Sequence, residues 1–214
     1  MKRFKFLSVL FIALSAVAFT SCLDDDDNDS RGLTPQEVQT AFDITRGSHS
    51  GNLIYAKWDY DKNANSKPDT LSGSWSINTD STMTFRNVPS EAIASCVSDS
   101  TLRDAIAEQA PVNINAYIGY ISLDPVQWLI NPSTVTYSNL SYNGGTHKVS
   151  IVFAVNSSFS YGQAVAQSTA SPRKQQMQII AAGLYVDDKL VEDGINYANI
   201  QRSQRIRALM FIEK

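Results

Sequence analysis

Cysteine and histidine are the residues that this sequence has least of. Its 214 residues include two cysteines, Cys22 and Cys96, and two histidines, His49 and His147. Two cysteines cannot build the several disulfides of a stapled secreted domain, and no His-Glu-x-x-His zinc motif or Gly-x-Ser-x-Gly nucleophile elbow is present. His49 is interpreted as a loop residue and His147 as an exposed strand residue beside a turn. We therefore expect no catalytic residue and a protein that is not an enzyme.

Long hydrophobic runs are also missing, except near the N-terminus. The apolar segment from Phe6 to Phe19 follows a positively charged start, and small residues lead from it to Cys22. It is shorter than the roughly 20 residues of a membrane-spanning helix, and its layout is typical of a signal peptide. A cysteine at the cleavage point can accept lipid. The sequence predicts a lipoprotein signal peptide at 1–21 and lipidation of Cys22; the alternative is an ordinary secretory signal with an incidental cysteine.

An acidic run follows the cysteine and consists of Asp24, Asp25, Asp26 and Asp27. These charges repel one another and have no apolar neighbours to join a core, so residues 22–32 are expected to form an extended tether. A cysteine followed by such a run resembles the export signal that sends lipoproteins of Bacteroidetes-type bacteria to the cell surface. The resemblance implies a lipid-anchored protein on the outer face of the cell outer membrane; the periplasmic leaflet is the alternative.

The rest of the chain has little excess charge. Of 18 basic and 21 acidic residues, three basic ones lie in the signal peptide and five aspartates in the tether, which leaves 15 basic residues, Arg31 of the tether among them, against 16 acidic ones. Without a basic stripe to neutralise phosphates, nucleic acid is not an expected partner. Residues 33–214 are enough for one domain with its own core, and no internal repeat divides them.

Two helical segments are predicted. Residues 34–37, Thr-Pro-Gln-Glu, contain an N-cap, a first-turn proline and the glutamate of a capping box, and this helix should end before Gly47. The second segment, in one piece or two, covers 90–109 with a period of 3.6 residues. It places Cys96 on the apolar face, as a buried thiol.

Most of the remaining sequence predicts β-strands. The strongest hairpin turn is Asn143-Gly144-Gly145, because these residues tolerate positive φ. The fold class is α+β, a largely antiparallel sheet of about nine strands that is curled, closed into a barrel or sandwiched. The predicted strands are 53–60, 74–77, 83–85, 112–123, 128–130, 134–142, 147–155, 177–186 with 190–191, and 207–212.

Several segments resemble those of one family. They are 22–27, 33–37, 74–81, 147–149 and 184–191. Together they are similar to an uncharacterised family of Bacteroides-type lipoproteins, a domain of unknown function that covers about the whole mature chain. The resemblance implies one domain, a bacterial origin and the cell envelope, and it assigns no catalytic residue. Asp188 stands where we expect a glycine, which leaves the type of that hairpin turn open.

One loop carries oxygen atoms at alternate positions. Asp61, Asn63, Asn65 and Asp69 match the spacing of side-chain ligands in a calcium loop. Ser66 stands where such loops prefer glycine, so a hairpin loop that uses Asn and Asp for turn formation is the alternative. Calcium is the one cofactor that the sequence suggests.

Three short motifs, each an aspartate followed by serine or threonine, resemble the acceptor for O-linked glycans in Bacteroidetes envelope proteins. The candidate acceptor residues are Thr70, Ser81 and Ser100.

Aromatic residues supply the material for a binding function. Exposed rings can stack on sugars or line an apolar cavity. We expect a non-enzymatic binding or interaction module for a glycan, an apolar ligand or another envelope protein, held at the membrane by its N-terminal lipid. The alternative is an envelope hydrolase whose two carboxylates are distant in sequence. The aromatic residues considered for binding are Tyr55, Trp58, Tyr60, Tyr117, Tyr120, Trp128, Tyr137, Tyr142 and Tyr161.

Overall fold

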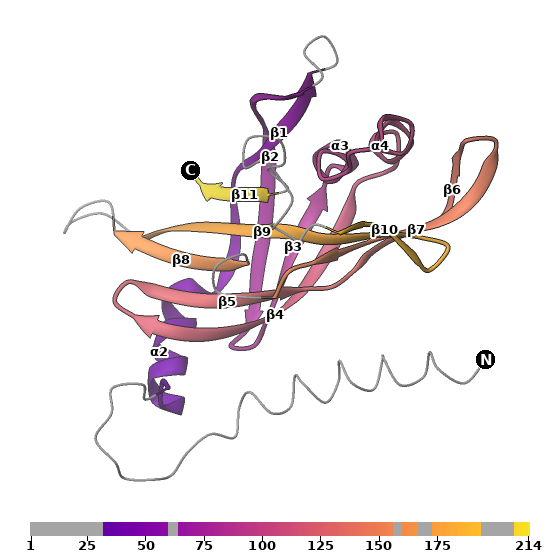
Figure 1. The fold of residues 1–214 in the computed structure, drawn as a ribbon. Helices are drawn as coiled ribbons and strands as arrows, with labels where there is room; N and C mark the ends of the chain where they lie inside the picture. The colour runs from indigo at the N-terminus through magenta and orange to yellow at the C-terminus, as the bar shows by residue number, and fades with distance from the viewer. Residues whose placement is uncertain (1–31, 60–63, 156–159, 167–172, 194–207) are drawn as a thin grey trace, which may run out of the picture. The chain divides into compact units, whose positions relative to one another are not determined.

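Eleven strands and three helices make up the part of the chain that the computed structural model describes, which is residues 32–59, 64–155, 160–166, 173–193 and 208–214. All paired strands are antiparallel (Figure 1). In chain order the elements are α2 (Pro35–Thr45), β1 (Gly47–Asp59), β2 (Ala64–Thr79), β3 (Thr82–Val88), α3 (Ser90–Ala94), α4 (Ser100–Ala107), β4 (Val112–Leu123), β5 (Val126–Pro132), β6 (Val135–Tyr142), β7 (Gly145–Phe153), β8 (Tyr161–Ala166), β9 (Arg173–Val186), β10 (Lys189–Asp193) and β11 (Ala208–Glu213).

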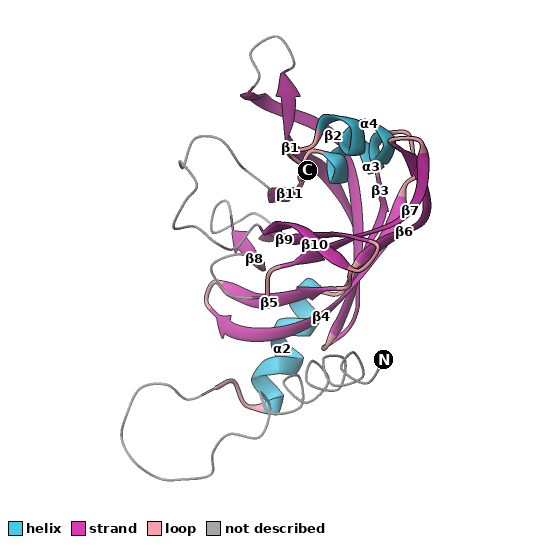
Figure 2. Ribbon diagram, turned by 45° about the vertical axis from the view of Figure 1, so that its right-hand side comes forward, coloured by secondary structure: helices cyan, strands magenta, loops and turns pink. Residues whose placement is uncertain are grey.

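Eight of the strands close into a barrel. Their order is β11-β1-β2-β3-β4-β5-β8-β9, and β9 pairs in turn with β11, so the ring has no free edge. The long strand β9 also leaves the ring: residues 173–180 pair with β8 and β11, whereas 181–186 pair with β7 and β10. β6, β7 and β10 therefore extend the sheet beyond the barrel, as Figure 2 shows.

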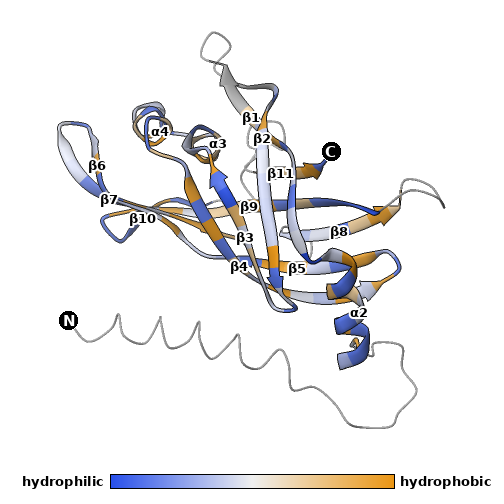
Figure 3. Cartoon of the chain, turned by 180° about the vertical axis from the view of Figure 1, so that it is seen from behind, coloured by the Kyte–Doolittle hydropathy of each residue, from blue (hydrophilic) through white to orange (hydrophobic). Residues whose placement is uncertain are grey.

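Every second side chain of a barrel strand points inward, and these side chains fill the barrel interior. In β4, Ile114, Ala116, Ile118 and Tyr120 are buried, while the residues between them are not. Hydrophobic and hydrophilic positions alternate along several strands (Figure 3), as expected when one face of a sheet meets the core. The largest fully buried side chains include Trp75, Trp128, Phe85 and Phe211.

The helix signals in the sequence are confirmed. Thr34 accepts a hydrogen bond from the Glu37 backbone N–H at 3.3 Å, and the Glu37 carboxylate accepts one from the Thr34 N–H at 2.7 Å. The resulting helix, α2, packs against β4 and ends at Thr45, before Gly47. The second segment is two short helices, α3 and α4. None of the helices in the described ranges is long and apolar enough to span a membrane.

Two hairpin turns have left-handed backbone at both central residues. These are Asn143 and Gly144, with φ of 50° and 76°, and Asp187 and Asp188, with φ of 49° and 62°. Two-residue turns of this kind match the twist of the strands they join. Asp188 therefore adopts the conformation that a glycine would take more easily.

The estimate of about nine strands is too low. The predicted strands omit β8, the first half of β1 and the first half of β2. These segments are rich in Gly, Ser, Gln and Asn, so they lack the run of β-branched and aromatic residues that marks a strand in sequence. Pairing makes them strands in the barrel: β8 pairs with β5 and β9, the first half of β1 with β2 and β11, and the first half of β2 with β1.

Candidate functional site

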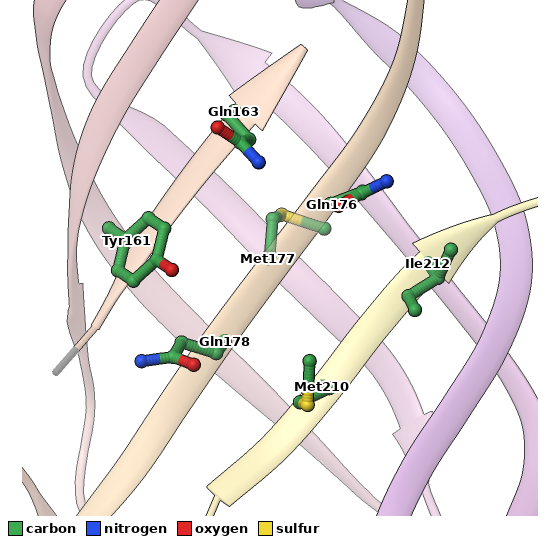
Figure 4. A pocket seen from close by; sticks show the side chains of 7 residues that line it. All are labelled: Tyr161, Gln163, Gln176, Met177, Gln178, Met210 and Ile212. Atoms are coloured by element: carbon green, nitrogen blue, oxygen red, sulfur yellow. The ribbon is translucent and has the colours of Figure 1, made fainter. Parts of the chain in front are cut away.

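A shallow hollow lies on the outside of the barrel, over β8, β9 and β11. Figure 4 shows the side chains that line it. It is open to solvent on one side, and its cavity volume is about 50 Å³. β8 contributes one aromatic ring and one amide, β9 two amides and one thioether, and β11 two apolar side chains. The lining residues are Tyr161, Gln163, Gln176, Met177, Gln178, Met210 and Ile212.

Strand register arranges the outward residues of the hollow in two rows. One row runs Tyr161, Gln178, Met210 and, on β1, Ile54; the other runs Gln163, Gln176, Ile212 and Asn52. Each step along a row crosses to the neighbouring strand. We call these eight side chains the neutral band, because none of them carries a charge.

Two of the three amides of the hollow retain unused hydrogen-bonding capacity. Within the described ranges, the side chains of Gln163 and Gln176 make no hydrogen bond to the protein. Each amide has one carbonyl acceptor and two N–H donors. The hollow therefore offers donors and acceptors next to an aromatic ring and a thioether, a combination that suits a ligand with hydroxyl groups and apolar faces.

A buried polar network lies on the inner side of the same strands. Gln175 is 2% exposed and joins three elements. Its carbonyl oxygen accepts a hydrogen bond from the Trp75 indole N–H at 2.7 Å, and its amide nitrogen donates to the Thr45 carbonyl at 2.8 Å. The same nitrogen lies 3.0 Å from His49 Nε2. The network thus fastens the end of α2 to β1, β2 and β9.

The indole N–H and the Glu213 carboxylate fix two of the roles in this network. The indole N–H can only donate, so it fixes the Gln175 oxygen as its acceptor and the Gln175 nitrogen as a donor. His49 Nε2 lies 3.0 Å from both the Gln175 nitrogen and the Thr45 carbonyl oxygen, and Nδ1 faces a carboxylate oxygen, which can only accept, so Nδ1 carries a proton. Nδ1 lies 2.8 Å from Glu213 Oε1, and Glu213 Oε2 accepts from the Gln175 backbone N–H at 2.8 Å. Glu213 of β11 is therefore bound to both β1 and β9.

The interpretation of His49 as a loop residue is wrong. It lies in β1, pairs in register with Trp75 and stacks on that ring at a centroid distance of 6.0 Å. Its partners Gln175 and Glu213 come from the last third of the chain, so no local pattern identifies them. His147 lies in β7 beside the turn and binds Asp187 at 2.8 Å.

Comparison with known families places most of the chain in one of them. The model of a domain of unknown function, DUF4840, matches residues 44–186. The chain belongs to the DUF4840 family. The match extends from the end of α2 to the end of β9 and so includes seven of the eight barrel strands. No curated protein and no solved structure matches the chain.

Four of the nine aromatic residues considered for binding lie in the core of the DUF4840 domain. These four, Tyr55, Tyr120, Trp128 and Tyr137, are at most 8% exposed. The prediction that they form a binding surface is therefore wrong. Tyr55, Tyr120 and Trp128 alternate with outward residues in strands of the barrel, whereas Tyr137 lies in β6, outside the ring, and its hydroxyl donates to Ser90 at 3.0 Å. Tyr117 is 70% exposed, and Tyr142 and Tyr161 are half-buried. The side chains of Trp58 and Tyr60 lie outside the described part.

Two carboxylates of the DUF4840 domain approach one buried phenol. The Tyr55 hydroxyl donates to Glu91 at 2.9 Å and lies 3.4 Å from Asp69. Burial, followed by the hydrogen bond and charge of Glu91, raises the pKa of Tyr55 well above its ordinary value. Burial also raises the pKa of Tyr120, to about 12, and that of Tyr137.

These tyrosines predict a loss of stability at high pH. Their folded pKa values exceed the unfolded value of about 10, so the folded state binds more protons between the two values. Their contribution is fully present below about pH 10 and disappears as the pH rises through the folded pKa. Urea unfolding at a series of alkaline pH values should show a falling free energy of unfolding. Tyr55→Phe should flatten this fall, whereas Tyr117→Phe, at an exposed position, should leave it unchanged.

The proposed calcium loop lies mostly outside the described residues. Asp61 and Asn63 are not described, and Asn65 is described only through its backbone pairing with Trp58. Asp69 lies in β2, where its carboxylate accepts from the Thr70 N–H at 2.8 Å. Within the described ranges, no three His, Cys, Asp or Glu side chains are grouped as a metal site would require. Calcium at this loop stays a prediction.

The three candidate O-glycan acceptors are all exposed. Thr70 lies in β2, Ser81 in the β2–β3 turn and Ser100 at the first position of α4. Cys96 is buried, 4% exposed, between α3 and α4. Cys22 and Asp24 to Asp27 lie outside the described residues.

Proposed function

We propose that this chain is a lipid-anchored lipoprotein of the bacterial cell envelope whose barrel binds a ligand without chemical conversion. The signal-peptide pattern and Cys22 support the anchor, and the acidic run after Cys22 supports display on the outer surface. The observation that carries the binding function is the hollow over β8, β9 and β11, where the Gln163 and Gln176 amides lie beside an aromatic ring and apolar side chains.

The anchor predicts a change of location when its cysteine is removed. Cys22→Ala should move the protein from the membrane fraction to the soluble fraction, because a lipid-modified cysteine holds the chain by several buried acyl chains. Mass spectrometry of the native N-terminus should show an acylated Cys22. Cys96→Ala, which changes the other cysteine, is the control and should stay in the membrane fraction. A native N-terminus without lipid would refute the anchor.

Display at the surface has a separate readout. Protease treatment of intact cells should digest the native protein. Replacing Asp24, Asp25, Asp26 and Asp27 together with alanine should protect it, because the export signal is then lost while Cys22 remains.

Binding at the hollow is tested by photocrosslinking in intact cells. Tyr161→p-benzoyl-L-phenylalanine places the crosslinker inside the hollow, and the same replacement at Tyr117 places it on an exposed tyrosine outside it. We expect an adduct from position 161 and none from position 117. Equal labelling at both positions, or none at 161, would contradict a ligand site in the hollow.

A hydrolase is the second candidate, favoured by the approach of Asp69 and Glu91 to the Tyr55 hydroxyl. Most glycoside hydrolases use a pair of carboxyl groups for catalysis. If this candidate is correct, the full-length protein releases reducing sugar from a glycan substrate, and Glu91→Gln abolishes the release while the exposed control Glu108→Gln does not.

A further inference from the structure

The neutral band has the dimensions of an extended ligand. It crosses four strands, so it measures about 14 Å at about 4.8 Å per strand, and its two rows lie about 7 Å apart. Its members are half-buried or exposed, with Met210 39% exposed. The band is thus long enough for several linked units and wide enough for one unit across.

The charge of the band restricts the ligand class. The first charged side chain on the same face of β9 is Lys174, two residues before Gln176. Phosphate, sulfate and carboxylate groups are recognised by arginine, lysine or clusters of N–H donors. The band contains neither arginine nor lysine. A ligand that is bound here must be held by neutral hydrogen bonds and by contact with apolar atoms.

The mixture of amides and apolar side chains argues against a purely apolar ligand. Covering Gln163 and Gln176 with hydrocarbon would remove water from two amides without replacing its hydrogen bonds, which is unfavourable. A sugar ring avoids this cost, because its hydroxyls donate and accept while its C–H face packs on an aromatic ring. Tyr161 lies in register with Gln178 and two residues from Gln163. A single sugar ring that packs on Tyr161 is therefore within reach of a neighbouring amide.

The buried network behind the band keeps its rows in register. Gln175 precedes Gln176, and Glu213 follows Ile212. Because Glu213 is bound to the Gln175 backbone and to His49, the strands β9, β11 and β1 are tied together directly beneath the band. A site whose side chains are fixed before binding loses less entropy when the ligand arrives.

We propose that the neutral band binds an uncharged glycan, with the Tyr161 ring against a sugar face and the Gln163 and Gln176 amides bonded to sugar hydroxyls. This rests on the proposed function, in that the hollow is taken as the ligand site. The polymer lies across β8, β9, β11 and β1, along the two rows.

The binding test uses the full-length protein in detergent, with dextran, laminarin and yeast mannan as neutral probes and heparin and polygalacturonate as charged ones. At least one neutral polymer should bind, and neither charged polymer should bind more tightly. The double variant Gln163→Ala with Gln176→Ala should raise the Kd about tenfold or more, as loss of two hydrogen bonds implies. Tyr161→Ala should have a similar effect, and the controls Tyr117→Ala and Gln36→Ala should stay within about twofold.

Two further measurements make the result decisive. The Kd for the neutral polymer should not change between low and high salt, because no charges pair across the interface. Far-ultraviolet circular dichroism and the thermal midpoint show that each variant is folded. Binding that is salt-sensitive, that favours the charged polymers or that survives all three band substitutions would overturn the proposal, as would failure of every neutral polymer to bind.

The composition of the adduct at position 161 separates this proposal from the proposed function. An adduct that contains carbohydrate supports both. A protein or lipid adduct overturns the glycan proposal and leaves the hollow as a binding site, whereas the absence of any adduct overturns both.

Discussion

Gly51→Ala is expected to remove a large part of the stability of the domain. A methyl group at position 51 would lie far inside van der Waals distance of the Ile212 carbonyl oxygen. That atom belongs to the backbone of β11, so it cannot turn away as a side chain could. The substitution must therefore separate β1 from β11 at Gly51 and Glu213, which lie in register.

The expected cost follows from what β11 buries. Leu209 and Phe211 are fully buried, and each contributes about 1.5–3 kcal/mol when it is removed from water. Losing the β1–β11 contact would thus cost about 3–6 kcal/mol, against a total stability of about 5–15 kcal/mol for a typical domain. Separation of β11 would also remove Glu213 from His49.

Gly73 provides a matched control, because it lies directly opposite Gly51 in β2. A methyl group there would meet Leu53 Cβ, the Leu53 backbone nitrogen and Phe211 Cδ1 at 3.3 Å, contacts that a shift of a few tenths of an ångström relieves. Urea unfolding of the two variants should show a large loss of stability for Gly51→Ala and a small one for Gly73→Ala. Equal losses would show that backbone contact with β11 is not the reason for glycine at position 51.

Local signals in the sequence predicted the local parts of the fold. The capping box at 34–37 and the Asn143-Gly144 turn depend on residues a few positions apart, so their physics is visible in the sequence. β8 was missed because Tyr161–Ala166 contains glycine, glutamine and two alanines. It becomes a strand because Gly162 lets the backbone approach the Trp128 ring of β5, and Trp128 comes 34 positions earlier.

The candidate site could not be predicted from the sequence for the same reason. The hollow depends on the register of β8, β9 and β11, which brings residue 161 opposite 178 and 178 opposite 210. Closure of a barrel fixes such pairings through all eight strands at once, and no pattern of period two specifies which strands meet. Of the aromatic residues that the sequence offered, Tyr161 lies in the hollow, whereas Tyr55, Tyr120 and Trp128 are buried in the interior that this closure creates.

Gln175→Leu is the second substitution expected to have a large effect. Leucine fills a similar volume but provides neither the acceptor for the Trp75 indole N–H nor the donor for the Thr45 carbonyl. Each buried polar group that loses its partner costs about 1–3 kcal/mol, so the expected loss is about 2–5 kcal/mol. The adjacent substitution Gln176→Leu, on the outer face, should change stability by no more than about 0.5 kcal/mol.

Two measurements separate the hydrogen bonds of Gln175 from its packing. Because Gln175 holds the last carbonyl of α2, Gln175→Leu should speed hydrogen exchange of the α2 amides more than that of the β4 amides. A double-mutant cycle with His49→Leu should give a coupling energy of about 0.5–3 kcal/mol, as expected for residues within one network. Additive losses, or unchanged exchange in α2, would mean that the amide only fills space. A coupled loss would show that one glutamine connects α2, the tryptophan of β2 and the strands beneath the neutral band.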